Sequence, residues 1–415
     1  MKLTWANFFH IYQPPDWDPK IIRKVSRESY EPFFAFLIEN DHVRVTLNMT
    51  GSLLVQLLQH NITEPLGLLK RLLMRGQIQI TGTPKYHPLA PLLPFHHVRR
   101  QITQHHDLLR EYFNMQLPLA GFYPPEMAIS PDLLTHIARE GFTWVITDDF
   151  LIPKGQTLRP QDGAIFEHTN LRIVFRNHVV SDYLGFFGKP GETGKHLQEV
   201  ITKETGQDTL ILTAMDGENL GHHRPESLPM WKTLVSDQGI ETITVSEYLE
   251  RQQSVTELIP ASGSWSTLPE DIERHIAFPL WKDPENPIHM LQWRLTDAVL
   301  AVADRCAEND HATFDAIDRA VISDQYWWAS AKPWWDRDLV IRLADRMADS
   351  VERLDLNAAE REEIRETVRE IHSMANEWQE KGIAQKHRAA FLAKESGVRY
   401  FGGERITNTW GSQEH

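Results

Sequence analysis

Residues 209–223, TLILTAMDGENLGHH, are the stretch from which the fold is best interpreted. An apolar, β-branched run of this length between polar residues is typical of a buried strand, and its polar end carries Asp216, Glu218 and Asn219. In parallel α/β sheets the loops at the carboxyl ends of the strands face a common crevice, so side chains there form the functional site. We therefore predict that Asp216 takes part in chemistry. A solvated turn explains the same residues about equally well, because Asp, Gly and Asn are frequent in turns.

The chain has 415 residues, of which 41% are hydrophobic, enough for a large core in two or three domains, or in fewer if a barrel holds much of it. Its formal net charge is −14. No basic stripe offsets this acidic balance, so a general affinity for nucleic acid or for an anionic membrane is not expected. The expected partner is neutral or small, and the oligomeric state is left open.

The single cysteine, Cys306, excludes an internal disulfide. The opening MKLTWANFFHIYQPP lacks the basic region, the long apolar run and the small-residue cleavage site of a secretory leader. No window approaches the roughly 18 consecutive apolar residues of a membrane helix. These features favour a cytoplasmic protein without a membrane segment.

Strand and helix patterns alternate through the first part of the chain. Besides the strand above, runs typical of strands occur at residues 3–9, 43–47, 77–81, 121–123, 142–147 and 242–245. Helical patterns occur at residues 96–113, 132–140, 195–204 and 226–237, and residues 163–187 suggest a two-stranded excursion. About seven βα units imply parallel strands with right-handed crossovers, and so a barrel or a doubly wound sheet.

The pattern changes past residue 255. Short loops rich in Ser, Gly, Pro and Trp precede long helical periods near residues 288–307, 311–331, 337–354 and 357–380. We predict a catalytic α/β part at residues 1–255, a Trp- and Pro-rich connection at residues 256–287, and an α-helical domain at residues 288–415 that completes the substrate cleft.

Glu126 is a second candidate for chemistry. It follows a strand in GFYPPE, where two prolines limit the backbone and so fix the carboxylate. An ordinary acidic residue near a helix start would also be found there, because the helix dipole favours it. Together with Asp216, Glu126 offers the two-carboxylate arrangement of glycoside cleavage, with one group as nucleophile and the other as acid/base.

Other chemistries have weaker support. The chain has 20 histidines but no HExxH motif, and His96, His97, His105 and His106 lack the i, i+4 spacing of a metal pair. His10 fits a ligand, a sugar hydrogen-bonder or a structural histidine. GxSxG, GxxxxGK[ST] and GxGxxG motifs are missing, which argues against Ser-His-Asp and phosphate-loop chemistry. We expect no metal and no cofactor.

Seven of the 13 tryptophans fall within residues 265–335: Trp265, Trp281, Trp293, Trp327, Trp328, Trp334 and Trp335. Flat aromatic faces suit the apolar faces of sugar rings, although tryptophans of a helical domain also build its core. We predict that Trp293 is a core residue. Trp265, in the loop ASGSWST, and Trp327 and Trp328, after Asp324, are expected in the cleft.

Five stretches in order along almost the whole chain resemble the motifs of glycoside hydrolase family 57, the retaining α-glucan enzymes. They are HIYQPP at residues 10–15, GQIQITGTPKYHP at 76–88, GFYPPE at 121–126, AMDGEN at 214–219 and SDQYWW at 323–328. Tyr12 stands where a second histidine is usual, and Gln79 stands where a glutamate is usual. The DGEN, GTPxYHP and SDxxWW forms, with GSWST between them, are most similar to the amylopullulanase and α-amylase branch.

The resemblance implies that Glu126 is the nucleophile and Asp216 the acid/base. With the aromatic argument, it implies substrate-binding roles for His10, Gln13, Gln79, His87, Trp265, Asp324, Trp327 and Trp328. It also implies an incomplete (β/α)7 barrel followed by helices, in agreement with the strand count. The departures at Tyr12 and Gln79 imply a changed substrate subsite, while both catalytic carboxylates are retained.

The expected activity is therefore hydrolysis of an α-linked glucan, with α-1,4 and α-1,6 linkages both open. A retaining reaction requires carboxyl groups about 5–5.5 Å apart, against about 6.5–9.5 Å for inversion. We expect Glu126 and desolvation to raise the pKa of Asp216. The alternatives are a 4-α-glucanotransferase, an α-galactosidase and, more remotely, a metal-dependent polysaccharide deacetylase or a glycan-binding protein without catalysis.

Overall fold

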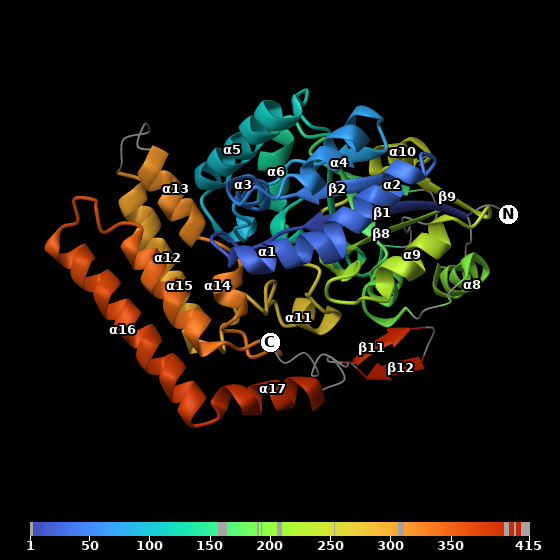
Figure 1. Ribbon diagram of the computed structural model, residues 1–415. Helices are drawn as coiled ribbons and strands as arrows, with labels where there is room; N and C mark the ends of the chain where they lie inside the picture. The colour runs from blue at the N-terminus through green and yellow to red at the C-terminus, as the bar shows by residue number, and fades with distance from the viewer. Residues whose placement is uncertain are drawn as a thin grey trace. The chain divides into compact units, whose positions relative to one another are not determined.

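The computed structural model describes residues 3–156, 164–188, 191, 193–205, 210–252, 254–305, 311–393, 398–401 and 404–407. The chain divides into two compact units, and the division falls between Trp265 and Ser266, within the segment predicted as a connection. Figure 1 shows the α/β elements of the first unit and the helices of the second. Cys306 lies outside the described residues.

The first unit contains two five-stranded sheets. One sheet has the order β3-β2-β1-β8, with β9 also on β1, and consists of β1 (Leu3–Ile11), β2 (Val45–Met49), β3 (Ile78–Ile80), β8 (Leu210–Asp216) and β9 (Ile240–Ile243). The other has the order β10-β6-β7-β5-β4 and consists of β4 (Gly121–Phe122), β5 (Trp144–Asp148), β6 (Ala164–His168), β7 (Leu171–Arg176) and β10 (Ser254–Glu257). In the described part of these sheets only β6 and β7 pair antiparallel.

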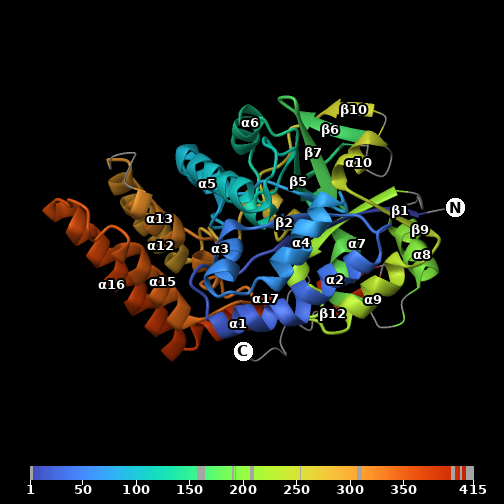
Figure 2. The same ribbon diagram turned by 45° about the horizontal axis from the view of Figure 1, so that its top comes forward.

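Helices lie on the outside of these strands (Figure 2). They are α1 (Pro19–Val25), α2 (Glu31–Glu39), α3 (Gly51–Gln59), α4 (Glu64–Met74), α5 (Phe95–Phe113), α6 (Pro131–Arg139), α7 (His178–Asp182), α8 (Gly194–Thr205), α9 (Ser227–Val235) and α10 (Val245–Glu250). Polar residues begin several of them: the Thr50 and Ser130 side chains accept from backbone N–H groups of α3 and α6, and Thr244 with Glu247 forms a capping box at α10. No described helix is both long enough and apolar enough to cross a bilayer.

Two backbone contacts join the edges of the sheets. Gly82, after β3, forms a parallel bridge with Phe122 of β4. The Asn177 N–H, after β7, donates to the Leu212 carbonyl of β8 at 2.9 Å. The α/β class with parallel strands is therefore confirmed, while the described strands form two sheets and no closed barrel.

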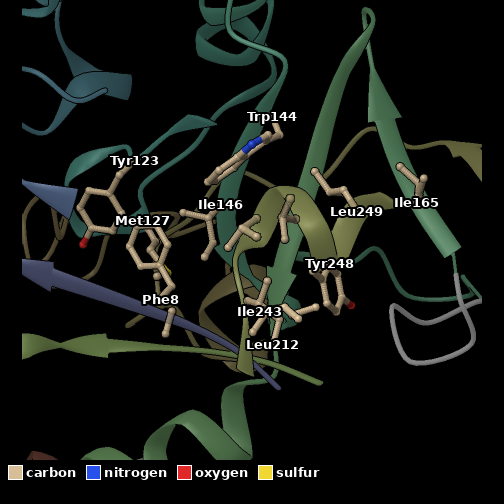
Figure 3. Close-up of a cluster of buried hydrophobic side chains, with 14 residues drawn as sticks. Phe8, Tyr123, Met127, Trp144, Ile146, Ile165, Leu212, Ile243, Tyr248 and Leu249 are labelled. Carbon is tan, nitrogen blue, oxygen red and sulfur yellow. The ribbon is translucent and has the colours of Figure 1, made fainter. Parts of the chain in front are cut away.

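The two sheets share one hydrophobic core (Figure 3). Phe8 and Leu212 reach it from the first sheet, and Trp144 and Ile146 reach it from the second. All nine residues of β1 are buried, as expected for a strand covered on both faces. This shared core holds the ends of strands from both sheets in fixed positions.

Most predicted elements of this unit are present, but the excursion at residues 163–187 is only partly right. β6 and β7 form there, yet β7 also pairs parallel with β5 and so belongs to the main sheet. The chain then turns into α7, because the Asn177 side chain accepts from the Val180 N–H at 2.8 Å and caps that helix. β1 also runs two residues further than predicted and includes His10.

The second unit is helical, with α11 (Pro269–Glu273), α12 (Pro287–Ala303), α13 (His311–Ala320), α14 (Asp324–Trp327), α15 (Arg337–Asp349), α16 (Ala358–Glu380) and α17 (Ile383–Ala393). Trp293 on α12 is 3% exposed, stacks on Tyr326 at 4.2 Å and donates its indole N–H to the Trp281 carbonyl at 2.9 Å. Its predicted core role is confirmed. A two-stranded sheet consists of β11 (Val398–Phe401) and β12 (Glu404–Thr407).

The close approach of β4 to Trp144 gives a stability prediction. A Cβ at Gly121 would lie 2.1 Å from the Trp144 indole, which is 1% exposed and cannot move aside. We expect Gly121→Ala to lower the free energy of unfolding by about 1–3 kcal/mol through overpacking, as measured by urea denaturation.

Gly67→Ala is the matched control. A Cβ at Gly67, inside α4, would meet nothing within 4 Å. Because alanine is favoured over glycine in a helix by roughly 0.5–1 kcal/mol, this variant should be as stable as the parent or more so. Equal losses at the two positions would contradict the packing argument.

Candidate active site

The polar ends of neighbouring parallel strands meet at one edge of the first unit. In the strand register His10 of β1 lies beside Asp216 of β8 and beside Asn48 of β2. In the second sheet Asp148 of β5 lies beside Arg176 of β7. This is the arrangement predicted from the carboxyl ends of the strands.

Aromatic rings form a stack at this edge. The His10 ring lies 4.4 Å from the Tyr123 ring and 4.9 Å from the His87 ring, and the Tyr12 ring lies 4.1 Å from the His87 ring. Burial lowers the pKa of His10 to about 3, although the hydrogen bond that His10 makes to the Asn48 side chain raises it. Burial and the neighbouring His10 lower the pKa of His87 well below its usual value. Both imidazoles are therefore neutral at physiological pH.

Nε2 of His10 and the hydroxyl of Tyr123 are buried polar atoms of this stack that have no hydrogen-bond partner among the described residues. Nδ1 of His10 lies 2.8 Å from the Asn48 amide oxygen, whose own NH2 group donates to Thr81 at 3.0 Å. Because an amide oxygen only accepts, we infer that Nδ1 of His10 carries the proton and that Nε2 is an acceptor. Buried polar groups without partners are uncommon, so these two atoms point to a ligand.

Glu126 is held in a strained backbone conformation. It follows Pro124 and Pro125 and has a φ of 61°, which is unusual for a residue with a side chain. The Trp265 loop holds it there: the Trp265 N–H donates to the Glu126 carbonyl at 3.2 Å, and the indole N–H donates to the Glu126 carboxylate at 3.1 Å. The other carboxylate oxygen lies 3.7 Å from Nδ1 of His87, and 17% of the side chain is exposed. The carboxylate is thus fixed and reachable.

Asp216 ends β8 beside His10. Burial raises its pKa to about 7, against the positive charge of Arg176, which lowers it. Of the two causes that we expected to raise this pKa, desolvation is present, whereas the charge of Glu126 is not among the causes found. Asp216 can therefore hold a proton near neutral pH.

The buried hydroxyl of Tyr123 is affected by the charges of both carboxylates. Its pKa is raised well above its usual value by burial, then by the charges of Asp216 and Glu126. The sequence did not single out this residue, although it lies within the GFYPPE motif between β4 and Glu126.

Glu218 is a further buried carboxyl that the sequence did not assign to the site. Its Oε1 accepts from the Tyr30 hydroxyl at 2.5 Å, from the Tyr12 N–H at 3.0 Å and from the Gln13 amide at 3.4 Å. Burial and the charge of Asp216 raise its pKa to about 8. Gln13, predicted to bind substrate, thus lies next to the site and contacts Glu218.

Arg176 is the centre of a buried charged cluster that was also missed. It donates to Asp148 at 2.7 Å and to the Ala214 carbonyl at 2.9 Å, and its guanidinium lies 5.6 Å from the Trp265 ring centre. His178 lies 2.8 Å from Asp148. Burial opposes ionisation of Asp148, but His178 and Arg176 outweigh it and lower its pKa. Arg176 is the last residue of the strand LRIVFR. The expectation that side chains at the carboxyl ends of parallel strands form the site would therefore have identified it.

The remaining predicted residues lie elsewhere. Gln79 sits within β3, where its side chain accepts from Thr46 at 3.2 Å and donates to Ser246 at 2.5 Å, so the structure does not bring it to the edge with His10. Asp324, Trp327 and Trp328 lie together at α14 of the second unit, where Trp327 and Trp328 are 4.9 Å apart. Their roles toward a substrate stay predictions.

Comparison with known proteins gives consistent matches. A family model described as Glycosyl hydrolase family 57 matches residues 4–262. An alpha-amylase from Pyrococcus horikoshii is 28% identical over 262 residues, which cover 60% of this chain and 40% of that protein. A 4-alpha-glucanotransferase from Thermococcus litoralis is 26% identical over 268 residues, which cover 60% of this chain and 39% of that protein. The chain thus spans less than half the length of these curated relatives.

Solved structures show a shared fold. The crystal structure of 4-alpha-glucanotransferase from Thermococcus litoralis has a TM-score of 0.67 and 18% identity, with 86% of this chain and 60% of that chain covered. That of a GH57-type branching enzyme from Pyrococcus horikoshii has a TM-score of 0.58 and 15% identity, with 91% and 95% covered.

The raised pKa of Glu218 gives a prediction for stability against pH. Between its usual value of 4.5 and its folded value of about 8, the folded state holds a proton that the unfolded state has lost. Stability contributed by this group therefore falls as pH rises through that window. Glu218→Gln removes the titration but keeps an oxygen acceptor for Tyr30. We compare the free energy of unfolding of this variant with that of the parent at each pH. We expect the difference to shift in favour of the variant by at least about 1.4 kcal/mol between pH 5 and pH 8, the equivalent of one pKa unit.

Chemical denaturation at each pH measures this difference. Glu199→Gln, at a carboxylate whose side chain is 62% exposed on α8, is the control and should show no comparable trend. A difference for Glu218→Gln that does not vary with pH would show that the carboxyl titrates normally.

Proposed function

Because the chain belongs to glycosyl hydrolase family 57, we propose that it is a retaining glycoside hydrolase that acts on an α-linked glucan. The observation that carries the proposal is the pair of carboxylates at strand ends, Glu126 after β4 and Asp216 at the end of β8. Both charges act on the buried Tyr123 hydroxyl, which supports a shared site.

The proposed reaction is a double displacement. The Glu126 carboxylate attacks the anomeric carbon, and Asp216 gives its proton to the glycosidic oxygen as the bond between the two atoms breaks. The products of this step are a glycosyl ester of Glu126 and a leaving sugar with a free hydroxyl. Asp216 then takes a proton from water, whose oxygen attacks the anomeric carbon and releases Glu126 as a carboxylate.

The surroundings of each carboxyl support its role. A general acid must be protonated at the working pH, and burial raises the pKa of Asp216 to about 7. A nucleophile must be ionised and fixed; the Trp265 indole donates to the Glu126 carboxylate, and the Trp265 backbone holds its main chain. The low pKa values of His10 and His87 keep positive charge away from Glu126 on that side.

The substrate class follows from the aromatic stack. Neutral rings of His10, Tyr12, His87 and Tyr123 suit an uncharged sugar, which presents apolar CH faces between its hydroxyls. Nε2 of His10 and the Tyr123 hydroxyl can meet sugar hydroxyls. We assign Gln13 a positioning role through Glu218.

The wider predictions complete the proposal. Trp265, Asp324, Trp327 and Trp328 are proposed to contact the glucan. The substrate-binding role of Gln79 stays a prediction, and in the structure its side chain bonds to Thr46 and Ser246. The contacts at Gly82 and Asn177 support an incomplete barrel of β1, β2, β3, β4, β5, β7 and β8, with the helical domain following it.

A 4-α-glucanotransferase is the close alternative, because a relative of similar identity carries that name. Incubation with maltoheptaose, followed by chromatography and anomeric proton NMR, separates the two. Shorter maltooligosaccharides alone, released as the α-anomer, identify a retaining hydrolase, whereas products both longer and shorter than the substrate identify a transferase. No change would redirect the search to an α-galactosidase, tested on nitrophenyl glycosides. Elemental analysis of the purified protein tests the remoter metal-dependent deacetylase.

Glu126→Gln tests the nucleophile. An amide cannot form the glycosyl ester, so we expect turnover of maltoheptaose to fall by at least about a thousandfold, roughly 4 kcal/mol of barrier. Folding should be unaffected, because the Gln side chain keeps an oxygen acceptor for Trp265. Glu140→Gln, at the end of α6, should turn over like the parent. Substantial activity of Glu126→Gln would refute the assignment.

The pKa of Asp216 predicts a limb of the pH profile. Below about pH 7 the group keeps the proton that the first step needs, and above it the proton is lost. We therefore expect kcat/KM to decline as pH rises through about 7, roughly tenfold for each further pH unit. Circular dichroism at each pH would show that the fold persists. A profile flat to pH 9 would rule out Asp216 as an acid with this pKa.

A further inference from the structure

The second unit contains a cavity of about 420 Å³ that the proposed reaction does not use. It lies between the start of α15, the end of α16 and the first half of α17. Figure 1 shows α17 leaving α16 after a sharp turn, where Gly382 adopts a φ of 65°. The volume falls within the range of about 300–1,000 Å³ that is typical of small-molecule sites.

An aromatic side chain lines this cavity and is held rigidly. The Trp335 ring stacks on Trp378 at 5.5 Å with an interplanar angle of 27°, and Trp378 is 5% exposed. The Trp335 indole N–H donates to the Gln379 amide oxygen at 2.7 Å. Trp335 itself is partly exposed. A fixed, partly exposed indole is the side chain best suited to stack on the apolar face of a sugar ring.

The polar lining suits a neutral ligand. Arg337 and Arg388 balance Asp336 and Asp338, so the formal charges of the lining cancel. Arg337 and Asp338 already form an ion pair, in which the Arg337 guanidinium donates to the Asp338 carboxylate at 2.6 Å.

Other polar groups are available to a ligand. The side chains of Gln385 and Arg388, both exposed on α17, make no hydrogen bond or ion pair with any described residue. They provide hydrogen-bond donors and an amide acceptor beside the indole, which is what a sugar's hydroxyl groups require.

We propose that this cavity is a second α-glucan site. Trp335 stacks on one sugar ring of the chain, and Gln385 and Arg388 hydrogen-bond its hydroxyls. The site retains the polymer and takes no part in bond cleavage. The choice of glucan as ligand rests on the proposed function, whereas the cavity, its fixed indole and its balanced charge do not.

Sedimentation with insoluble starch tests the proposal, using the 415-residue chain with Glu126→Gln so that the polymer is not consumed. Adding Trp335→Ala should weaken the affinity for starch at least about tenfold. The fraction of protein that sediments with the starch should fall accordingly. Tyr112→Ala, which removes another partly exposed aromatic, on α5, is the matched control and should bind like its parent. With Glu126 intact, Trp335→Ala should cleave maltoheptaose with unchanged kcat and KM.

A second variant covers the event that Trp335→Ala disturbs its stacking partner Trp378. Gln385→Ala with Arg388→Ala removes only exposed groups of α17 and should also weaken starch binding. Unweakened binding by both variants would overturn the proposal. Binding that inorganic phosphate abolishes at constant ionic strength would overturn it too, because the ligand would then be an anion.

The two proposals fail in different ways. Cleavage of maltoheptaose by the intact protein, with starch binding that does not depend on Trp335, rejects only the second site. Failure of the intact protein to cleave any α-glucan, with no binding to starch, rejects the glucan assignment for both sites.

Discussion

The parallel register of β1 is the constraint on which the site depends. Its hydrogen bonds to β8 and β2 place His10 between Asp216 and Asn48. A slip of one residue would turn the His10 side chain to the other face of the sheet. The register is held because all nine residues of β1 are buried and Phe8 packs into the core shared by both sheets. The position of Asp216 is thus a consequence of core packing.

Glu126 is positioned by a different means. It lies on a loop, and its φ of 61° is costly for a residue with a side chain. The surrounding structure supplies the stabilisation: Ile129 pairs with Gly263, and Trp265 contacts both the main chain and the carboxylate of Glu126. Two segments about 140 positions apart in sequence therefore build one half of the carboxylate pair. Strain accepted at a site in this way is typical of functional residues.

Burial without matching charge explains the electrostatics of the site. Desolvation disfavours the charged form of every group, so the histidines become neutral and Asp216 and Glu218 retain protons. Asp148 is the exception, because His178 and Arg176 compensate it directly. The result is a neutral aromatic surface beside Asp216, whose raised pKa suits its proposed role as the acid in glycoside cleavage.

The sequence by itself determined the α/β class, the helical second part and the candidacy of Glu126 and Asp216, because apolar periodicity, prolines and polar strand ends are local signals. Only the tertiary structure decided that Tyr123, Glu218 and Arg176 interact with the charge of Asp216 and that Gln79 contacts Thr46 and Ser246. The physical reason is that hydrogen bonds and burial join distant segments. Glu218 accepts a hydrogen bond from the Tyr12 N–H, 206 positions away, and Gln79 donates one to Ser246, 167 positions away. No pattern within one segment specifies such partners.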